Sequence, residues 1–230
     1  MKSDTPGSLV GQPTGPISLI ARRYLDALIV PSRLQALETV IHALRAGMPP
    51  LDLYVDVIGW AHHRIGDLWE RNEISVSQEH VATAISQLAL SQIYPSLPRK
   101  QPAGRTAIVA CVEGELHDMG ARMVADMLET EGFEVVLLGA NPPTDSLGQM
   151  VRDLSPDVVG LSVSMESFLP AAVQAVERIR EAGPEEIQIL VGGHAASELG
   201  AYEGVHLVDD ELDVREVITG LTSDFDARRL

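Results

Sequence analysis

The sequence predicts an N-terminal four-helix bundle followed by an α/β domain with a Rossmann-like or flavodoxin-like parallel sheet. From residue 17 to residue 94 the apolar residues recur with a helical period. The stretch 95–105 holds three prolines and a glycine, which is typical of a linker. After it, short apolar strands alternate with helices, the pattern of a parallel sheet covered on both faces. We therefore expect a tail, a bundle, a linker and a sheet domain, at 1–16, 17–97, 98–105 and 106–230.

The bundle is expected to contain four helices, because stop signals separate four apolar-periodic stretches. Ser32 with Gln35, and Ser75 with Gln78, form capping-box patterns at two of the helix starts. Short connections between the helices favour an antiparallel bundle. The expected helices span residues 17–29, 32–46, 51–71 and 76–94.

The second half of the chain is expected to alternate strand and helix, with right-handed connections. The expected strands span residues 106–112, 134–138, 158–163, 187–191 and 205–208. The expected helices lie near 118–131, 145–154, 168–182, 195–200 and 212–221.

Charge and cysteine content exclude several classes of function. The formal net charge is −16, from 33 acidic against 17 basic residues, which disfavours direct binding to nucleic acid or to an anionic membrane surface. The single cysteine, Cys111, lies in an expected buried strand, so no disulfide forms within the chain. The first 16 residues, rich in Gly, Pro, Ser and Thr, are expected to be a flexible tail, without the apolar core of a signal peptide. These features predict a cytoplasmic protein that binds neither membrane nor nucleic acid.

Three loops that follow expected strands carry unusual residues. The first reads Glu115-x-His117-x-x-Gly120, the second contains Ser162 and Ser164, and the third contains Gly192-Gly193. Because the carboxyl ends of parallel strands share one edge of a sheet, and ligands bind at that edge, we expect these loops to form one site.

The chemistry expected at this edge is that of a metal centre. His117 is a candidate axial ligand, and Glu115 is expected to accept a hydrogen bond from its second ring nitrogen and raise its basicity. Asp118, at the start of the next helix, is also expected to be a cofactor-binding residue. One histidine is a poor site for a free divalent ion, since zinc takes three or four protein ligands. The metal is therefore expected to arrive inside a macrocycle. Taken singly, each feature has a plainer explanation, as a surface histidine, a packed hydroxyl or a Gly-Gly turn.

The spacing resembles the cobalamin-binding signature Asp/Glu-x-His-x-x-Gly, followed by Ser-x-Leu and then Gly-Gly. The resemblance implies that the histidine displaces the cofactor's dimethylbenzimidazole base from cobalt, and that the nucleotide tail enters a slot beside the sheet. One position departs, because Ser164 stands where leucine is usual. The matching residues are Glu115, His117, Gly120, Ser162, Gly192 and Gly193.

A second pattern lies in the helical half, where nine residues separate Trp69 from the pair Glu79-His80. On spacing alone, a tryptophan between helices and a glutamate near a helix N-terminus explain it equally well. The Trp-x9-Glu-His pattern resembles the cobalamin photoreceptors of the CarH/LitR type. That resemblance implies that the bundle covers the upper face of adenosylcobalamin, that these three residues enclose the deoxyadenosyl group, and that light breaks the cobalt–carbon bond.

Two departures from that family shape the expected function. Gene-regulating members carry a helix-turn-helix domain, whereas only about 16 residues precede the bundle here, so direct DNA binding is not expected. The residue after the tryptophan is Glu70, where some members have a histidine that later ligates cobalt; His62, His63 and His80 are the substitutes that the sequence offers.

The leading expectation is a light-sensing signalling protein, not an enzyme, that forms a dimer or tetramer and acts on a downstream partner protein. It also resembles the stand-alone photocobilin group, which implies an additional noncovalent bilin such as biliverdin. The alternative is a corrinoid carrier protein of a methyltransferase system, and a third reading is a sheet domain that binds no cofactor.

Overall fold

The computed structural model describes residues 14–200, 202, 204–208 and 214–227. Within the chain, the division between Pro98 and Arg99 separates two compact units. Most of the tail expected at residues 1–16 lies outside the described residues, and the first helix begins at Gly15. In the described part of the chain, no helix is long and apolar enough to cross a membrane.

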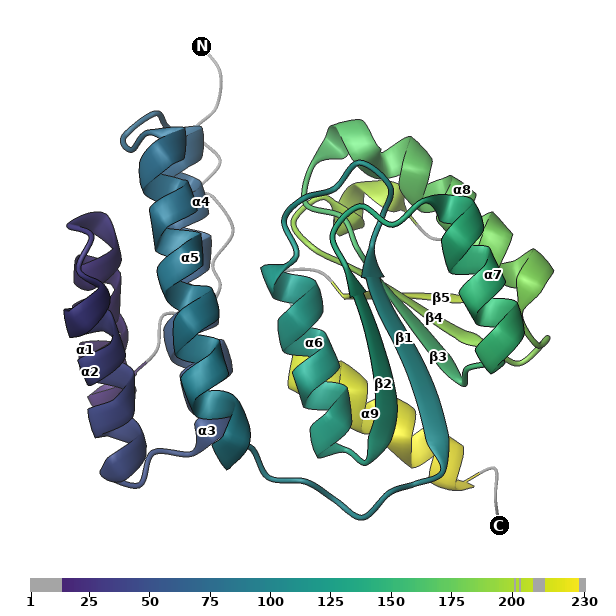
Figure 1. Ribbon diagram of the computed structural model, residues 1–230, viewed down its shortest axis with the longest axis horizontal. Coiled ribbons are helices and arrows are strands. Elements are labelled where there is room, and N and C mark those ends of the chain that lie inside the picture. The colour runs from purple at the N-terminus through teal and green to yellow at the C-terminus, as the bar shows by residue number, and fades with distance from the viewer. Residues whose placement is uncertain (1–13, 201, 203, 209–213, 228–230) are drawn as a thin grey trace. The chain divides into compact units, whose positions relative to one another are not determined.

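The first unit is the expected helical bundle (Figure 1). Ser75 and Gln78 form the complete capping box that the sequence predicted, whereas at Ser32 the structure shows half of it, the hydrogen bond that the side chain accepts from the backbone N–H of Gln35. The elements are α1 (Gly15–Ile29), α2 (Arg33–Arg45), α3 (Pro50–Asp52), the π-helix η1 (Leu53–Gly59), α4 (Trp60–Glu70), α5 (Val76–Ile93) and the 3-10 turn η2 (Tyr94–Ser96).

The helix expected at 51–71 is continuous but not uniform. It runs from Pro50 to Glu70, and its middle, Leu53–Gly59, has π-helical hydrogen bonding. Such segments are rare and often lie at functional sites. The apolar pattern did not predict it, because a π-turn changes the hydrogen-bond spacing while leaving a buried face of similar period.

Two tyrosines anchor the core of the bundle. Tyr24 and Tyr54 are fully buried. The Tyr24 hydroxyl lies 2.8 Å from Ser86 Oγ, and the Tyr54 hydroxyl donates to the Leu90 carbonyl at 3.1 Å. Both buried hydroxyl groups therefore have partners, which avoids the cost of an unsatisfied polar atom in a core.

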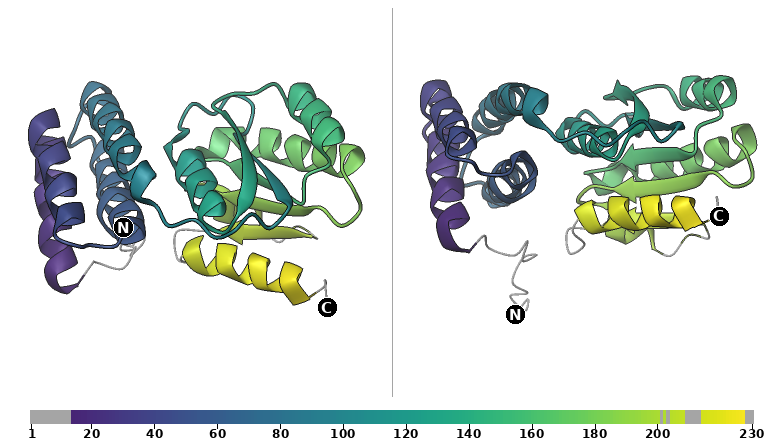
Figure 2. Two further views of the ribbon diagram at one scale, coloured as in Figure 1. Left: turned by 60° about the horizontal axis from the view of Figure 1, so that its bottom comes forward. Right: turned by 90° about the horizontal axis from the view of Figure 1, so that it is seen from below.

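The second unit is a five-stranded parallel sheet in the order β2-β1-β3-β4-β5, which is the flavodoxin-like order (Figures 1 and 2). The central strands β1 and β3 are buried almost throughout, whereas the edge strands β2 and β5 are partly exposed. Near-continuous apolar runs are what two covered faces require. The strands are β1 (Arg105–Cys111), β2 (Phe133–Gly139), β3 (Val158–Ser162), β4 (Gln188–Gly192) and β5 (Val205–Val208).

Helices cover both faces of this sheet. α7 and α8 pack on one face, where Leu147 and Val176 meet strand residues such as Ile108 and Val159 in one apolar cluster. α6 lies on the other face and contacts α9. The elements are α6 (Met119–Thr130), α7 (Thr144–Leu154), α8 (Leu169–Ala182), α9 (Val214–Ala227), and the 3-10 turns η3 (Glu166–Phe168) and η4 (Ala196–Leu199).

Two helix predictions in this unit were wrong in extent. The helix expected at 195–200 is only the turn η4, which ends at Gly200 with a positive φ of 69°. The last helix continues to Ala227, past the predicted end at residue 221, and the predicted start at residue 212 lies outside the described residues. The strand starts differ by one residue at most; β1, for example, begins at Arg105.

Candidate functional site

The strand order puts the topological switch point of the sheet between β1 and β3. The chain leaves β1 toward β2 on one side and later returns to β3 on the other, which is the point where doubly wound sheets bind ligands. Cys111 pairs with Ser162, and Ser162 pairs with Gly192, so three strands end at the same level. The three loops that the sequence singled out therefore start side by side.

Glu115 is the buried acidic group of this edge. Its side chain is fully buried and accepts three hydrogen bonds. Oε1 accepts from the His117 backbone N–H at 2.9 Å and from His117 Nδ1 at 2.5 Å, while Oε2 accepts from the Ser164 backbone N–H at 2.8 Å. Burial by itself raises the pKa of Glu115, but these hydrogen bonds and the nearby imidazole outweigh it, so the pKa lies below its usual value. Glu115 is thus a carboxylate at neutral pH.

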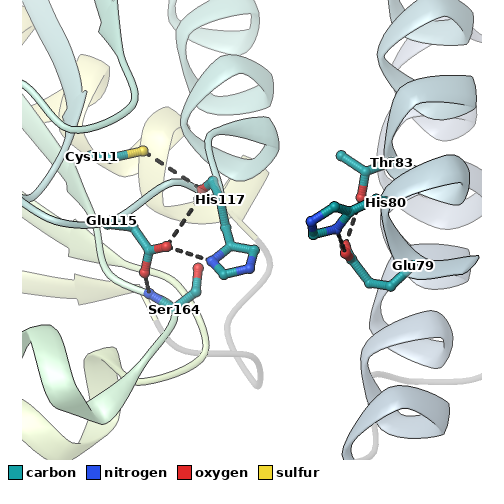
Figure 3. Close-up of polar contacts among 7 residues, drawn as sticks. All are labelled: Glu79, His80, Thr83, Cys111, Glu115, His117 and Ser164. Carbon is teal, nitrogen blue, oxygen red and sulfur yellow. Dashed lines mark hydrogen bonds and ion pairs between the residues drawn. The ribbon is translucent and has the colours of Figure 1, made fainter. Parts of the chain in front are cut away.

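The carboxylate fixes the orientation of the His117 ring. The hydrogen bond that the sequence predicted between Glu115 and the ring is present, and it places the proton on Nδ1. The ring is 49% exposed, and Nε2 points away from Glu115 (Figure 3). On the other side, the Cys111 thiol lies 3.6 Å from the His117 carbonyl oxygen. This carboxylate–histidine arrangement is the one that orients metal-binding histidines.

Gly120 and Ser162 lie next to each other at the carboxyl edge of the sheet. A Cβ built on Gly120 would meet only one atom within 4 Å, Ser162 Oγ at 4.0 Å, so protein packing does not require glycine there. Asp118 occupies the N-cap position of α6, and its Oδ2 would be 3.9 Å from a Cβ on Gly139. Small and polar groups therefore lie at the start of α6.

The fold itself explains why residues 192 and 193 are glycines. Gly193 has a φ of 105°, and a Cβ there would lie 2.4 Å from the Val163 carbonyl oxygen. A Cβ on Gly192 would lie 3.3 Å from the Val208 carbonyl oxygen. The atoms that require glycine at these two positions are therefore protein backbone atoms.

The helical unit carries the second group of predicted residues. Glu79 Oε2 binds His80 Nδ1 at 2.5 Å, and Glu79 Oε1 accepts from the Thr83 hydroxyl at 2.8 Å (Figure 3). The Glu79 side chain is 17% exposed and the His80 side chain 70% exposed. Trp69, in the last turn of α4, is partly exposed. A carboxylate therefore orients an exposed imidazole in each unit.

Of the other histidines considered as substitute ligands, His62 is the best defined. Its Nε2 atom is buried and makes no hydrogen bond in the described structure. Burial lowers the pKa of His62 to about 4, although the charge of Glu79 acts in the opposite direction. His62 is therefore neutral at physiological pH, and its buried Nε2 faces the interior of the bundle rather than solvent.

Some residues around the histidine loop were not predicted. Glu113 Oε2 accepts from the Thr144 backbone N–H at 2.9 Å, and the loop after β2 contributes contacts through Asn141. The Phe168 ring lies against Gly114, 2.7 Å from where a Cβ would be. The one available signal was Asn-Pro-Pro directly after a strand, a pattern that marks a turn but names no partner.

Comparison with known proteins assigns this site to a family. Residues 105–211 match the family model described as B12 binding domain, and residues 20–94 match a second model with the same description. Both compact units are covered by these matches. Each unit therefore contains a segment that matches a B12-binding domain, and the predicted cobalamin binding is supported.

Individual relatives fall into two groups. The HTH-type transcriptional repressor CarH of Myxococcus xanthus is 33% identical over 159 residues, which cover 68% of this chain and 52% of CarH. The trimethylamine corrinoid protein of Methanosarcina barkeri is 27% identical over 160 residues, or 68% of this chain and 74% of that protein. This chain thus spans about half the length of CarH.

A solved structure shows the same fold. The Methanosarcina barkeri monomethylamine corrinoid protein superposes with a TM-score of 0.76 at 22% identity, covering 88% of this chain and 98% of that one. The helical part followed by a five-stranded parallel sheet is therefore the corrinoid protein fold, as the sequence predicted.

The residues at the sheet edge fit a corrinoid. His117 offers one imidazole ring whose orientation Glu115 fixes, so a metal bound there takes its other ligands from elsewhere, as in a macrocycle. Among the described residues, no group of three or more His, Cys, Asp or Glu side chains is arranged to hold a metal ion. A Cβ on Gly120 would occupy space beside Ser162 that protein packing does not require to be empty, so the glycine there leaves room for a ligand.

Proposed function

We propose that this protein is a light-responsive signalling protein, not an enzyme, and that it binds adenosylcobalamin with His117 as the lower ligand of cobalt. The observation that carries the binding part is the Glu115–His117 pair, in which a buried carboxylate holds Nδ1 and leaves Nε2 directed away. In this arrangement His117 replaces the cofactor's own base, which is the base-off, His-on mode. Adenosylcobalamin supplies a cobalt–carbon bond that visible light breaks.

The residues of the chain divide the binding between them. Glu115 keeps Nδ1 protonated, so Nε2 is the basic nitrogen of His117. The nucleotide tail is assigned to the remaining residues of the sheet edge, which are Asp118, Gly120, Ser162, Ser164, Gly192 and Gly193. These roles rest on the position of each residue at the carboxyl edge of the sheet.

The helical unit is proposed to cover the upper ligand. Trp69 offers an apolar surface, and Glu79 with His80 offers a polar pair whose geometry is set by Thr83. What supports this proposal is the resemblance of the Trp-x9-Glu-His pattern to the photoreceptor family, together with 33% identity to CarH. The proposal needs one arrangement of the bundle to bind the adenosyl group better than another, since a ligand shifts an equilibrium only by its differential affinity.

The proposed output is a change in bundle position or in subunit assembly, as a dimer or tetramer, that a downstream protein recognises. The formal charge of −16 favours a protein partner over direct contact with nucleic acid. A bilin such as biliverdin would bind noncovalently, because the one cysteine of the chain, Cys111, is buried in β1.

The test is to load the protein with adenosylcobalamin in darkness and then illuminate it with green light. We expect a protein-bound spectrum that changes on illumination, and a change in mass measured by light scattering. The matched control is Trp69→Phe, which keeps an aromatic ring but reduces its area. An unchanged spectrum and unchanged mass after illumination would refute light sensing, and a far-red band before illumination would reveal the bilin.

A second function, that of a corrinoid carrier in a methyltransferase system, is favoured by the relatives named trimethylamine and monomethylamine corrinoid protein. It uses the same Glu115–His117 pair. The two functions differ in the upper ligand, since a sensor should bind adenosylcobalamin more tightly than methylcobalamin in darkness. Equal affinities, with methyl transfer from a partner enzyme, would favour the carrier.

A further inference from the structure

Asn141, in the loop after β2, makes two hydrogen bonds to the loop that carries Glu115 and His117. Asn141 lies after β2, and its Oδ1 accepts a hydrogen bond from the Gly114 backbone N–H at 2.7 Å. Its own backbone N–H donates to the Glu115 carbonyl at 2.9 Å. Asn141 therefore hydrogen-bonds to Gly114 and Glu115, which come shortly before His117 in the chain.

The backbone of Asn141 explains why an asparagine stands there. Its φ is 51°, in the left-handed region that asparagine tolerates better than most residues. Pro142 follows and restricts its conformation further. Glycine adopts this φ freely but has no acceptor, whereas aspartate keeps an acceptor oxygen at the same place.

The contact matters because Gly114 is a glycine, whose backbone is conformationally freer than that of other residues. Gly114 has a φ of 92°, and the Phe168 ring limits it on its other side. The Asn141 hydrogen bond fixes its amide. With Gly114 and the Glu115 carbonyl fixed, the Glu115 side chain has one position in the core. The His117 ring, which hydrogen-bonds to that side chain, is then fixed in position as well.

We propose that Asn141 is a positioning residue for the cobalt ligand His117, acting through Gly114 and Glu115. This inference rests on the proposed function, in which His117 binds the metal. In this role Asn141 acts through its hydrogen bonds to Gly114 and Glu115 and restricts the loop, so that the imidazole is presented in one orientation before the cofactor arrives.

Two substitutions separate the side-chain acceptor from the backbone conformation. Asn141→Gly keeps the positive φ without strain and retains the backbone bond to Glu115, but removes the acceptor. Asn141→Asp keeps both. The matched control is Ser155→Gly, which replaces another residue with positive φ, 45°, in the same unit, after α7 and before the amino end of β3.

The measurements cover the apo-protein and the complex. In the apo-protein, amide hydrogen exchange at Gly114, followed by NMR, should be faster in Asn141→Gly than in the wild type and unchanged in Ser155→Gly. Titration with hydroxocobalamin in darkness should give an affinity lower by about tenfold or more for Asn141→Gly, the usual effect of losing a group that orients a metal ligand. The same variant should show a mixed absorption spectrum with part of the cofactor not bound to histidine.

Asn141→Asp should restore exchange, affinity and spectrum to within about twofold of the wild type, because its carboxylate still accepts from Gly114. A purely structural role would lower thermal stability without changing the ligation spectrum. The proposal is overturned if Asn141→Gly exchanges faster at Gly114 but binds as tightly as the wild type, or if Asn141→Asp is as weak as Asn141→Gly. If the wild type itself binds no corrinoid, the proposed function fails, and this inference fails with it.

Discussion

Glu115→Gln replaces a fully buried carboxylate with an amide of the same shape. In the wild type one oxygen accepts two hydrogen bonds from His117, and the other accepts one from the Ser164 backbone. The amide has a single acceptor oxygen and an NH2 group that only donates. In either orientation of the amide, the NH2 group therefore faces a protein N–H.

The expected cost follows from that mismatch. A buried donor left without a partner costs about 1–3 kcal/mol, so the free energy of unfolding should fall by about that amount at pH 7. For a chain of this size, 1 kcal/mol lowers Tm by about 2–4 °C, which predicts a decrease of about 2–12 °C. Corrinoid affinity should fall by about 10–100-fold, because the ring of His117 loses the group that orients it.

The effect should depend on pH in a defined direction. The pKa of Glu115 is lower in the folded protein than its ordinary value of 4.5. The carboxylate therefore stabilises the fold fully above pH 4.5, and this contribution is lost as pH falls through the folded-state pKa. The stability difference between wild type and Glu115→Gln should be complete at neutral pH and should shrink as pH falls below 4.5.

The assay is thermal unfolding of the apo-protein followed by circular dichroism, together with a hydroxocobalamin titration. The matched control is Glu113→Gln in the same loop, whose exposed carboxylate accepts from Thr144. If Glu115→Gln lowered Tm and affinity no more than Glu113→Gln does, the role assigned to the buried carboxylate would be wrong.

Three other predictions concern single positions. Gly193→Ala should lower the free energy of unfolding, measured by chemical denaturation, by at least about 2 kcal/mol, because φ is positive there and a Cβ would overlap the Val163 carbonyl. Gly220→Ala in α9, where a Cβ would meet nothing within 4 Å, should not destabilise the protein. Equal effects of the two substitutions would contradict this prediction. Burial, followed by the charge of two carboxylates, raises the pKa of Cys111 to about 12, so the thiol should resist alkylation at pH 8 until the protein unfolds, and fast labelling of the native protein would refute it. Burial lowers the pKa of His62 from 6.5 to about 4, so the stability of the helical unit should decline as pH falls from 6.5 toward 4. In urea unfolding, His62→Phe should remove that pH dependence. If the variant kept the pH dependence of the wild type, His62 would be excluded as its source.

Fold class and the main elements could be predicted because periodicity and punctuation agree along this chain. Ser75 with Gln78 marks a helix start by chemistry that is local to four residues, and the structure contains that capping box. The strands β1 and β3 consist mainly of apolar residues and are buried almost throughout, as covered faces on both sides require. Such signals need no knowledge of distant neighbours.

The elements that were wrong depend on hydrogen-bond spacing or on chain ends. The π-helical segment Leu53–Gly59 buries a face much like that of an α-helix, so its apolar pattern does not distinguish the two. The turn Ala196–Leu199 has helix-compatible residues, but Gly200 ends it after one turn. The extension of α9 to Ala227 lies in a polar stretch without a stop signal.

The candidate site shows the same division. Glu115 and His117 are two residues apart, so their hydrogen bond could be expected from the sequence. The bonds from Ser164 and Asn141 join loops far apart in the chain, and nothing in one sequence reports such pairs. Gly193 was recognised as special, but its reason, the Val163 backbone, became apparent only in the fold.

The most direct test of the central claim is electron paramagnetic resonance of the protein loaded with cobalamin and reduced to cob(II)alamin, after growth with ¹⁵N-labelled histidine. If His117 Nε2 is the lower ligand, the superhyperfine lines should change from the triplets of ¹⁴N to the doublets of ¹⁵N, and His117→Ala should lose them. Triplets that persist in the labelled protein would show that the cofactor's own base remains on cobalt, and would contradict the account.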